Sequence, residues 1–252
     1  MRLAATLAVA VLAVVTVATA AKADWDRGDD YKMHFPQLPD LNGWDVYFGE
    51  PKVLADDWKC SETGFVSDVH FWFSSREDHP FQIQKIHVSI HDDDRTTNPD
   101  FSQPGRLRWE RDFSPTLFTV RDYGTGPQGW YDPNLGEWIY PDHYMIYQAN
   151  IVNIRDPFWQ EEGHIYWLDL SVVARAPDGS TEPVQLGWKT SLDHFEDWAV
   201  WGDAPAGALP VWEPIYINDV PQDLAFVITP EPATLALMGL GLAGLLARRR
   251  RK

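Results

Sequence analysis

Between its two ends, the chain carries short apolar runs with a period of two and no sustained helical period. In one run Ile86, Val88 and Ile90 alternate with polar residues that include His87 and His91, so we expect a strand with those histidines on its solvent-exposed face. Similar runs, separated by Pro, Gly, Asn and Asp, lie at 66–73, 117–120, 144–151, 163–173, 184–189 and 224–228. The pattern predicts an all-β domain, first as an antiparallel jelly-roll-like β-sandwich and second as another antiparallel barrel-like fold.

The N-terminal end is typical of a secretory signal. Arg2 precedes an apolar stretch over 3–21, and small residues at Ala21 and Ala23 fit the cleavage rule of signal peptidase. We expect 1–23 to be removed by signal peptidase, so that the mature chain is exported and begins at Asp24. The alternative is an uncleaved N-terminal anchor.

The C-terminal end has three parts in a fixed order. Pro230, Glu231 and Pro232 precede an uncharged apolar stretch over 233–247, and a basic tail follows. The tail residues are Arg248, Arg249, Arg250, Arg251 and Lys252. A single helix over 233–247 would span about 22 Å, short of the roughly 30 Å hydrocarbon core, which predicts a weak membrane anchor. The basic tail would stay in the cytoplasm and place the domain outside the membrane.

This three-part tail, over 229–252, resembles the PEP-CTERM sorting signal. The resemblance implies that exosortase, a membrane enzyme, recognises Pro230, Glu231 and Pro232 and that the protein is released to, or linked at, the cell surface. It also implies an association with exopolysaccharide production. The middle of the chain is similar to an uncharacterised domain found in PEP-CTERM proteins, through residues 55–60, 68–72, 86–91, 159–163, 166–168 and 187–190. That second resemblance bears on architecture and implies no activity.

Charge and cysteine content limit the partners of the domain. The chain has 21 basic and 37 acidic residues, of which seven basic and one acidic lie in the two ends, leaving 14 against 36, or −22. Such a field repels nucleic acid and anionic lipid and attracts cations. The single Cys60 excludes an intramolecular disulfide and is either a reactive thiol or a small buried residue. We expect a flexible lead-in over 24–40 and one domain over 41–229.

Tryptophan is abundant, with 13 residues in the chain. A flat aromatic ring can stack on the apolar face of a sugar ring, which favours a carbohydrate-binding role. The candidates in a Pro- and Gly-rich region, expected to be exposed, are Trp130, Tyr131, Trp138 and Tyr140. Tryptophans inside strand patterns are instead expected in the core; these are Trp72, Trp167 and Trp188.

Catalytic and metal signals are weak. Asp92, Asp93 and Asp94 follow a strand and could hold Ca²⁺ through their carboxylate oxygens, or form a solvated acidic turn. Glu161 and Glu162 are adjacent, so on a strand they would face opposite sides and would not form an acid/base pair. We therefore expect no catalytic residue and no cofactor other than Ca²⁺. The leading hypothesis is a non-enzymatic structural or interaction protein of the extracellular matrix, whose partner is extracellular polysaccharide. The alternatives are a carbohydrate-binding module and a glycan-active enzyme built from acidic residues on separate strands.

Overall fold

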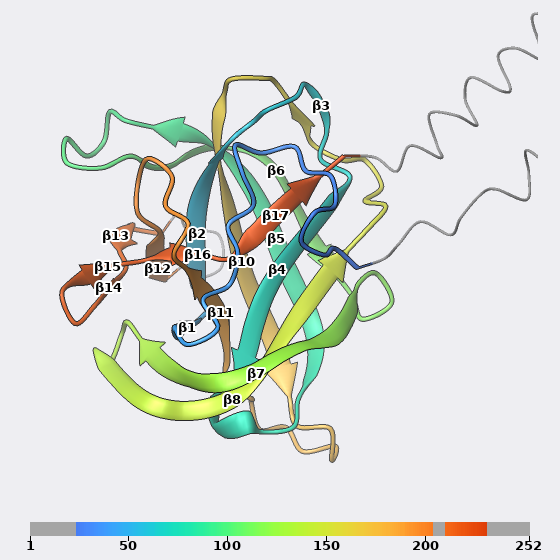
Figure 1. Ribbon diagram of the computed structural model, residues 1–252, viewed down its shortest axis with the longest axis vertical. Coiled ribbons are helices and arrows are strands. Elements are labelled where there is room, and N and C mark those ends of the chain that lie inside the picture. Colours follow the sequence, from blue (N-terminus) through green and yellow to red (C-terminus); the bar gives the residue numbers. More distant parts are fainter. Residues whose placement is uncertain (1–23, 204–209, 231–252) are drawn as a thin grey trace, which may run out of the picture.

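The computed structural model describes residues 24–203 and 210–230, and two large sheets dominate this part of the chain (Figure 1). The seven-stranded sheet has the order β16 (Asp223–Leu224), β11 (Leu186–Ser191), β1 (Trp44–Tyr47), β7 (Thr119–Asp132), β8 (Glu137–Ile151), β4 (Asp68–Ser75) and β17 (Phe226–Thr229). The six-stranded sheet has the order β13 (Glu213–Pro214), β12 (Val200–Asp203), β2 (Lys52–Lys59), β10 (Ile165–Arg175), β5 (Gln82–Asp94) and β6 (Gln103–Phe113).

Three short elements complete the described chain. β3 (Gly64–Phe65) pairs with β9 (Trp159–Gln160), and β14 (Tyr216–Ile217) pairs with β15 (Val220–Pro221). A single 3₁₀ turn, η1 (Arg76–Asp78), follows β4. The prediction of an all-β domain is confirmed.

The seven-stranded sheet closes on itself. Besides its neighbour β1, strand β11 pairs with β4 through Leu186, Gly187 and Trp188, so β11, β1, β7, β8 and β4 form a five-stranded ring. Toward the other end of β4, β17 takes the place of β11 as the partner, with Phe226 opposite Phe71. The ring matches the second, barrel-like expectation, and its β1–β7 pairing is parallel, against the antiparallel prediction.

The main apolar core lies between the outer side of this ring and the six-stranded sheet. Phe48, Phe71 and Trp188 contact one another with ring centroids 6.1–6.4 Å apart. The inward face of β5 contributes Ile86, Val88 and Ile90, all fully buried, as the alternation predicts. Trp72, Trp167 and Trp188 are also fully buried, which confirms their assignment to the core, and Cys60 is a buried free cysteine.

The expectation of a solvent-exposed outer face on β5 is wrong at its centre. His91 is buried, with its imidazole between the Asp169 carboxylate and the Gly105 carbonyl, while His87 is half-buried beside Asp112. A second apolar cluster on this side, which includes Trp167 and Trp212, covers part of the sheet. His91 therefore has internal hydrogen-bond partners in place of water.

The segment 24–40, expected as a flexible lead-in, packs against the sheets. Trp25 and Met33 are buried, and Met33 forms an isolated bridge with Cys60. Gln37 bridges to Phe226 and donates a hydrogen bond to the buried Asp56 carboxylate. The segment is irregular because it lacks a strand pattern, yet its apolar residues fix it in place.

The predictions for the two ends lie mostly outside the described residues. This holds for the signal over 1–23, for Glu231 and Pro232, for the apolar stretch 233–247 and for the basic tail. Within 24–203 and 210–230, no helix has the length and apolar character needed to cross a membrane.

Candidate functional site

The aromatic residues predicted to bind sugar lie on β7 and β8 and divide between two faces. Tyr131 and Trp138 are cross-strand partners and therefore share a face, and Tyr140 follows two residues after Trp138 on the same face. Trp138 is 53% exposed and Tyr140 47%, while Tyr131 is half-buried. Trp130 points to the opposite face and is fully buried, so its expected exposure is wrong.

Sequence reasoning missed one member of this face, Trp44 on β1. Its ring reaches across β7 to Trp138 and Tyr140, with centroid distances of 6.1 and 5.7 Å. The side chain can cross β7 only because residue 129 is glycine, since a Cβ there would overlap the indole ring. We call the four residues Trp44, Tyr131, Trp138 and Tyr140 the hairpin aromatic surface.

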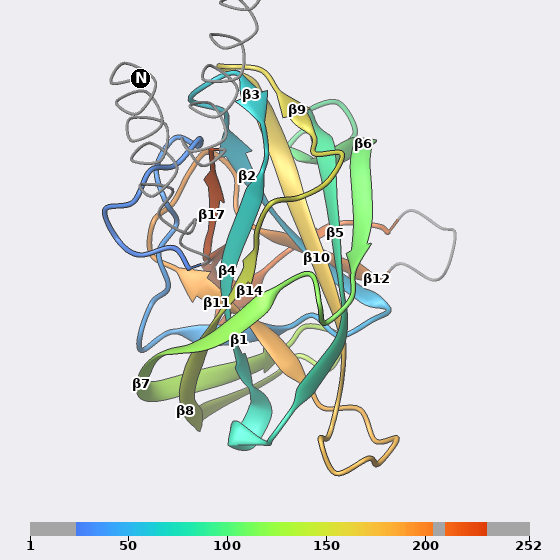
Figure 2. The same cartoon turned by 90° about the vertical axis from the view of Figure 1, so that its right-hand side faces the viewer.

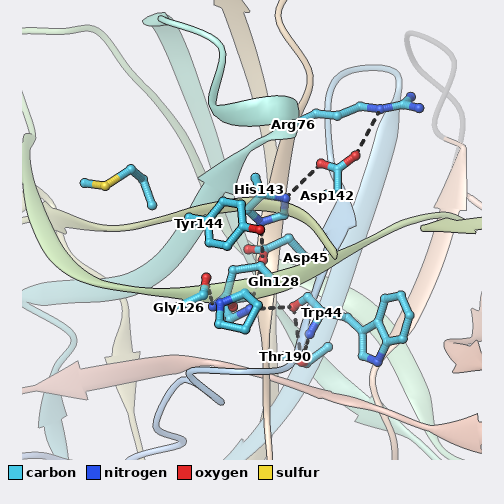
Figure 3. Close-up of polar contacts among 12 residues, drawn as sticks. Trp44, Asp45, Arg76, Gly126, Gln128, Asp142, His143, Tyr144 and Thr190 are labelled. Atoms are coloured by element: carbon cyan, nitrogen blue, oxygen red, sulfur yellow. Dashed lines mark hydrogen bonds and ion pairs between the residues drawn. The ribbon is translucent and has the colours of Figure 1, made fainter. Parts of the chain in front are cut away.

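Behind this surface, the inside of the ring holds a network of buried charges (Figure 3). Asp45 Oδ2 lies 2.9 Å from His143 Nε2 and 2.9 Å from Lys189 Nζ. Since β7 separates β1 from β8, the Asp45–His143 contact shows that both side chains point into the ring. His143 Nδ1 lies 2.9 Å from Asp142, which in turn lies 3.9 Å from Arg76.

The charge states of this network follow from its geometry. Each imidazole nitrogen of His143 faces a carboxylate, an arrangement that only the doubly protonated ring satisfies. Burial by itself would lower the pKa of His143, but the hydrogen bond and charge of Asp45 and the hydrogen bond of Asp142 raise it. Burial would likewise raise the pKa of Asp45, yet Lys189 and His143 hold it below its ordinary value. The network therefore joins β1, β8 and β11 as charged pairs.

Hydrogen bonds to the backbone complete the support of Trp44. Thr190 Oγ1 accepts a hydrogen bond from the Trp44 amide at 2.9 Å and donates one to the Trp44 carbonyl at 3.1 Å. On the other side, the Tyr140 hydroxyl donates to the Pro127 carbonyl at 3.3 Å. The aromatic rings are thus attached to strands whose positions are fixed from behind.

A cleft of about 780 Å³ lies at the other end of the molecule, beside β3 and β9. Its lining residues are Asp92, Asp93, Arg108, Phe158, Trp159, Glu161, Gly163, His164, Ile165 and Tyr166. Both main views place β3 at the end opposite the β7–β8 hairpin (Figures 1 and 2). The cleft and the hairpin aromatic surface are therefore separate.

The three aspartates predicted to hold Ca²⁺ point to different partners. Asp92 forms an ion pair with Arg108 at 3.0 Å, and Asp93 forms one with Arg95 at 2.7 Å. Asp94 accepts hydrogen bonds from Thr96 and Thr97, which lower its pKa to about 2. Among the described residues, no three His, Cys, Asp or Glu side chains are grouped to hold a metal ion. Ca²⁺ binding stays a prediction. The three aspartate side chains do not converge on one point where a single Ca²⁺ ion could be bound.

Asp169, an acidic residue on β10, does not form a Ser-His-Asp triad with its neighbours. Asp169 contacts Ser89 and His91. The Ser89 hydroxyl and the Asp169 carboxylate, however, both face the same nitrogen of His91, Nε2. A Ser-His-Asp triad needs the serine and the aspartate on different imidazole nitrogens. Glu161 and Glu162 lie after β9 and are exposed, and Glu196 forms an ion pair with Arg95.

Three further carboxyl groups are buried near the start of β16. Burial is the main cause that raises the pKa of Asp56 to about 8 and that of Asp223 to about 10. Burial and the neighbouring charge of Asp56 raise the pKa of Asp57 well above 3.8, and neither of its carboxylate oxygens has a hydrogen-bond partner. The strand pattern gave no sign of Asp56 and Asp57, because every residue of β2 but the last is buried and no alternation marks a polar face.

The end of the domain is close to the predicted sorting motif. β17 pairs with β4 up to Thr229, which lies opposite Asp68, and Pro230 follows directly. The predicted sorting motif would therefore follow the last strand of the domain directly, with no linker between strand and motif.

Comparisons with known proteins agree with this division of the chain. Residues 229–252 match the PEP-CTERM protein-sorting motif, which implies processing by exosortase and export to the cell surface or the extracellular space. Residues 33–229 match a domain of unknown function, DUF7901. Neither the curated proteins nor the solved structures include a match to the chain. The chain therefore belongs to the DUF7901 family and carries the sorting motif of an exosortase substrate.

Proposed function

We propose that this protein is an exported component of the cell surface or extracellular matrix that binds extracellular polysaccharide without cleaving it. Signal peptidase would remove 1–23, and the stretch 233–247 would hold the chain in the cytoplasmic membrane until exosortase acts. The sorting motif over 229–252 supports the location. The hairpin aromatic surface supports the binding role.

The observation that carries the binding role is the pair of half-exposed rings on a rigid support. Trp138 and Tyr140 present flat apolar area to solvent, which is the complement of the C–H face of a sugar ring. Trp44 contacts both rings from the side and is itself held by Thr190. Such preorganisation reduces the entropy lost on binding.

Two observations favour binding over hydrolysis. Two acidic side chains on separate segments have partners of their own: Asp169 contacts Ser89 and His91, and Glu196 forms an ion pair with Arg95. In addition, Trp138 and Tyr140 extend from a hairpin and are not among the residues that line the cleft. A surface of this kind suits attachment along a polymer chain.

The test is affinity electrophoresis of the full chain, purified in mild detergent, through gels that contain neutral or charged soluble polysaccharides. We expect retardation by at least one neutral polysaccharide. The double variant Trp138→Ala, Tyr140→Ala should weaken that binding about tenfold or more, whereas Leu192→Ala, at an 81% exposed position, should not. Undiminished binding by the double variant would refute this surface, and release of reducing ends would refute the non-catalytic role.

A further inference from the structure

The cleft beside β3 and β9 has a different chemistry from the hairpin aromatic surface. One wall is the Trp159 ring, which is 49% exposed. Phe65, the cross-strand partner of Trp159, packs edge-on against that ring with centroids 4.8 Å apart. Trp159 is therefore a fixed aromatic platform at the mouth of a concave site.

The lining carries more negative than positive charge. Asp92, Asp93 and Glu161 contribute three carboxylates, against one guanidinium from Arg108. Asp92 is paired with Arg108, and Asp93 is held by Arg95 and by the Trp167 indole N–H at 2.9 Å. Among the described residues, the Glu161 carboxylate has one ion-pair neighbour, the exposed His164 imidazole at 3.3 Å. Glu161 is thus the carboxylate most available to a positively charged ligand.

From this combination we infer that the cleft binds a saccharide unit that carries a free amino group. The C–H face of the sugar ring stacks on Trp159, and the ammonium group lies between the aromatic face and the Glu161 carboxylate. The hydroxyl groups exchange hydrogen bonds with the Asp92–Arg108 pair, whose planar groups offer both acceptors and donors. The volume of about 780 Å³ falls in the range of small-ligand sites.

The same charges select against other ligands. A uronic acid would bring a carboxylate to three others in a domain that already carries an excess of acidic residues. A neutral sugar would stack on Trp159 but would form no ion pair with Glu161. The inference concerns a site separate from the hairpin aromatic surface, so either can fail without the other.

The test uses three probes at mildly acidic pH, measured by titration calorimetry with the full chain in mild detergent. The probes are a glucosamine oligomer, its N-acetylated counterpart of the same length, and an oligomer of galacturonic acid. We expect the glucosamine oligomer to bind at least about tenfold more tightly than the acetylated one, with loss of binding at high salt. The galacturonic acid oligomer should not bind.

Variants locate the binding in the cleft. Trp159→Ala should weaken glucosamine binding about tenfold. Glu161 is exposed, so Glu161→Gln should not affect folding. The variant should lose the preference for the free amine, while the sugar ring still stacks on Trp159. Leu192→Ala, at an 81% exposed position outside both sites, should leave all three results unchanged.

Four results would overturn the inference. They are equal affinity for the acetylated and free oligomers, binding that survives Trp159→Ala, an undiminished amine preference in Glu161→Gln, and, with a lysine oligomer added as a fourth probe, equal binding of that oligomer through Trp159. The last result would make the cleft a general cation site. Binding of neutral polysaccharide by the hairpin aromatic surface would stand in all four cases.

Discussion

His143 Nε2 and Asp45 Oδ2 lie 2.9 Å apart across the inside of the five-stranded ring, although β7 separates the strands that carry them. Both side chains are fully buried, so water does not screen the pair. The charge on His143 is therefore part of the fold, and titration of that charge should change the stability of the domain.

The first prediction concerns pH. His143 has a raised pKa in the folded state, so its stabilising effect is complete below the ordinary value of 6.5 and is lost as pH rises through the raised pKa. His143→Gln should cost about 3 kcal/mol at mildly acidic pH, and the difference from wild type should shrink at alkaline pH. Urea unfolding at several pH values measures both, and a constant difference would contradict the charged pair.

The second prediction is a stabilising substitution. Asp57 is buried, and its raised pKa means that the folded state loses stability as pH rises above 3.8 toward that pKa. Asp57→Asn removes the ionisable group and should stabilise the domain by about 1 kcal/mol or more at neutral pH. Thermal unfolding at neutral and acidic pH is the measurement. Asp178→Asn, in a solvent-exposed loop, is the control and should change little.

The third prediction links packing to binding through Gly129. A methyl group at this position overlaps the Trp44 ring, so Gly129→Ala should displace Trp44 from Trp138 and Tyr140. We expect a loss of about 1–3 kcal/mol in stability together with weaker polysaccharide binding. Gly124→Ala, in the same strand, is the matched control because a Cβ there meets no atom within 4 Å. Equal behaviour of the two variants would contradict the role of Trp44.

The fourth prediction tests the order of the segment 24–40. Trp25 is buried against Trp72, with ring centroids 5.9 Å apart, and its carbonyl accepts a hydrogen bond from Gln148. Trp25→Ala should therefore destabilise the domain by about 3–5 kcal/mol. Tyr31→Ala, at a 43% exposed position in the same segment, should cost far less. If both variants unfold like wild type, the segment is a flexible lead-in after all.

The fifth prediction concerns processing. In cells that contain exosortase, the intact mass of the surface protein should lack 1–23 and the segment after the Pro-Glu-Pro motif. Replacement of Pro230, Glu231 and Pro232 by alanine should leave the full tail in place and keep the chain in the membrane fraction. Deletion of exosortase should likewise leave the full tail on the wild-type chain and keep it in the membrane fraction. A wild-type mass that retains 233–252 would contradict sorting.

Period-two alternation was a reliable guide where one face of a strand is apolar. It located β5 through Ile86, Val88 and Ile90, because burial of one face is a local property of the sequence. It missed β2, where every residue but the last is buried and Asp56 and Asp57 interrupt the apolar run. It also missed β6. This edge strand carries charged residues at most of its exposed positions, so its sequence shows no alternation between an apolar and a polar face.

The candidate sites depended on contacts that no local pattern contains. The assignment of Trp130 and Trp138 to one exposed region failed because they lie on opposite faces of the β7–β8 hairpin, one inside the ring. Trp44 joins Trp138 from a strand far away in sequence, through a gap left by Gly129. In the cleft, Asp92 and Trp159 come from distant segments in the same way. Only the aromatic abundance and the acidic run were visible beforehand.

The two ends of the described chain leave the domain from the same side. Asp24 contacts Asn150 and Thr229 lies opposite Asp68, both near the start of β4, whereas the β7–β8 hairpin lies at the far end (Figures 1 and 2). Any attachment made at the sorting motif would hold the domain by its β17 end. The β7–β8 hairpin would then point away from the attachment point, and the length of the domain would set its distance from that point.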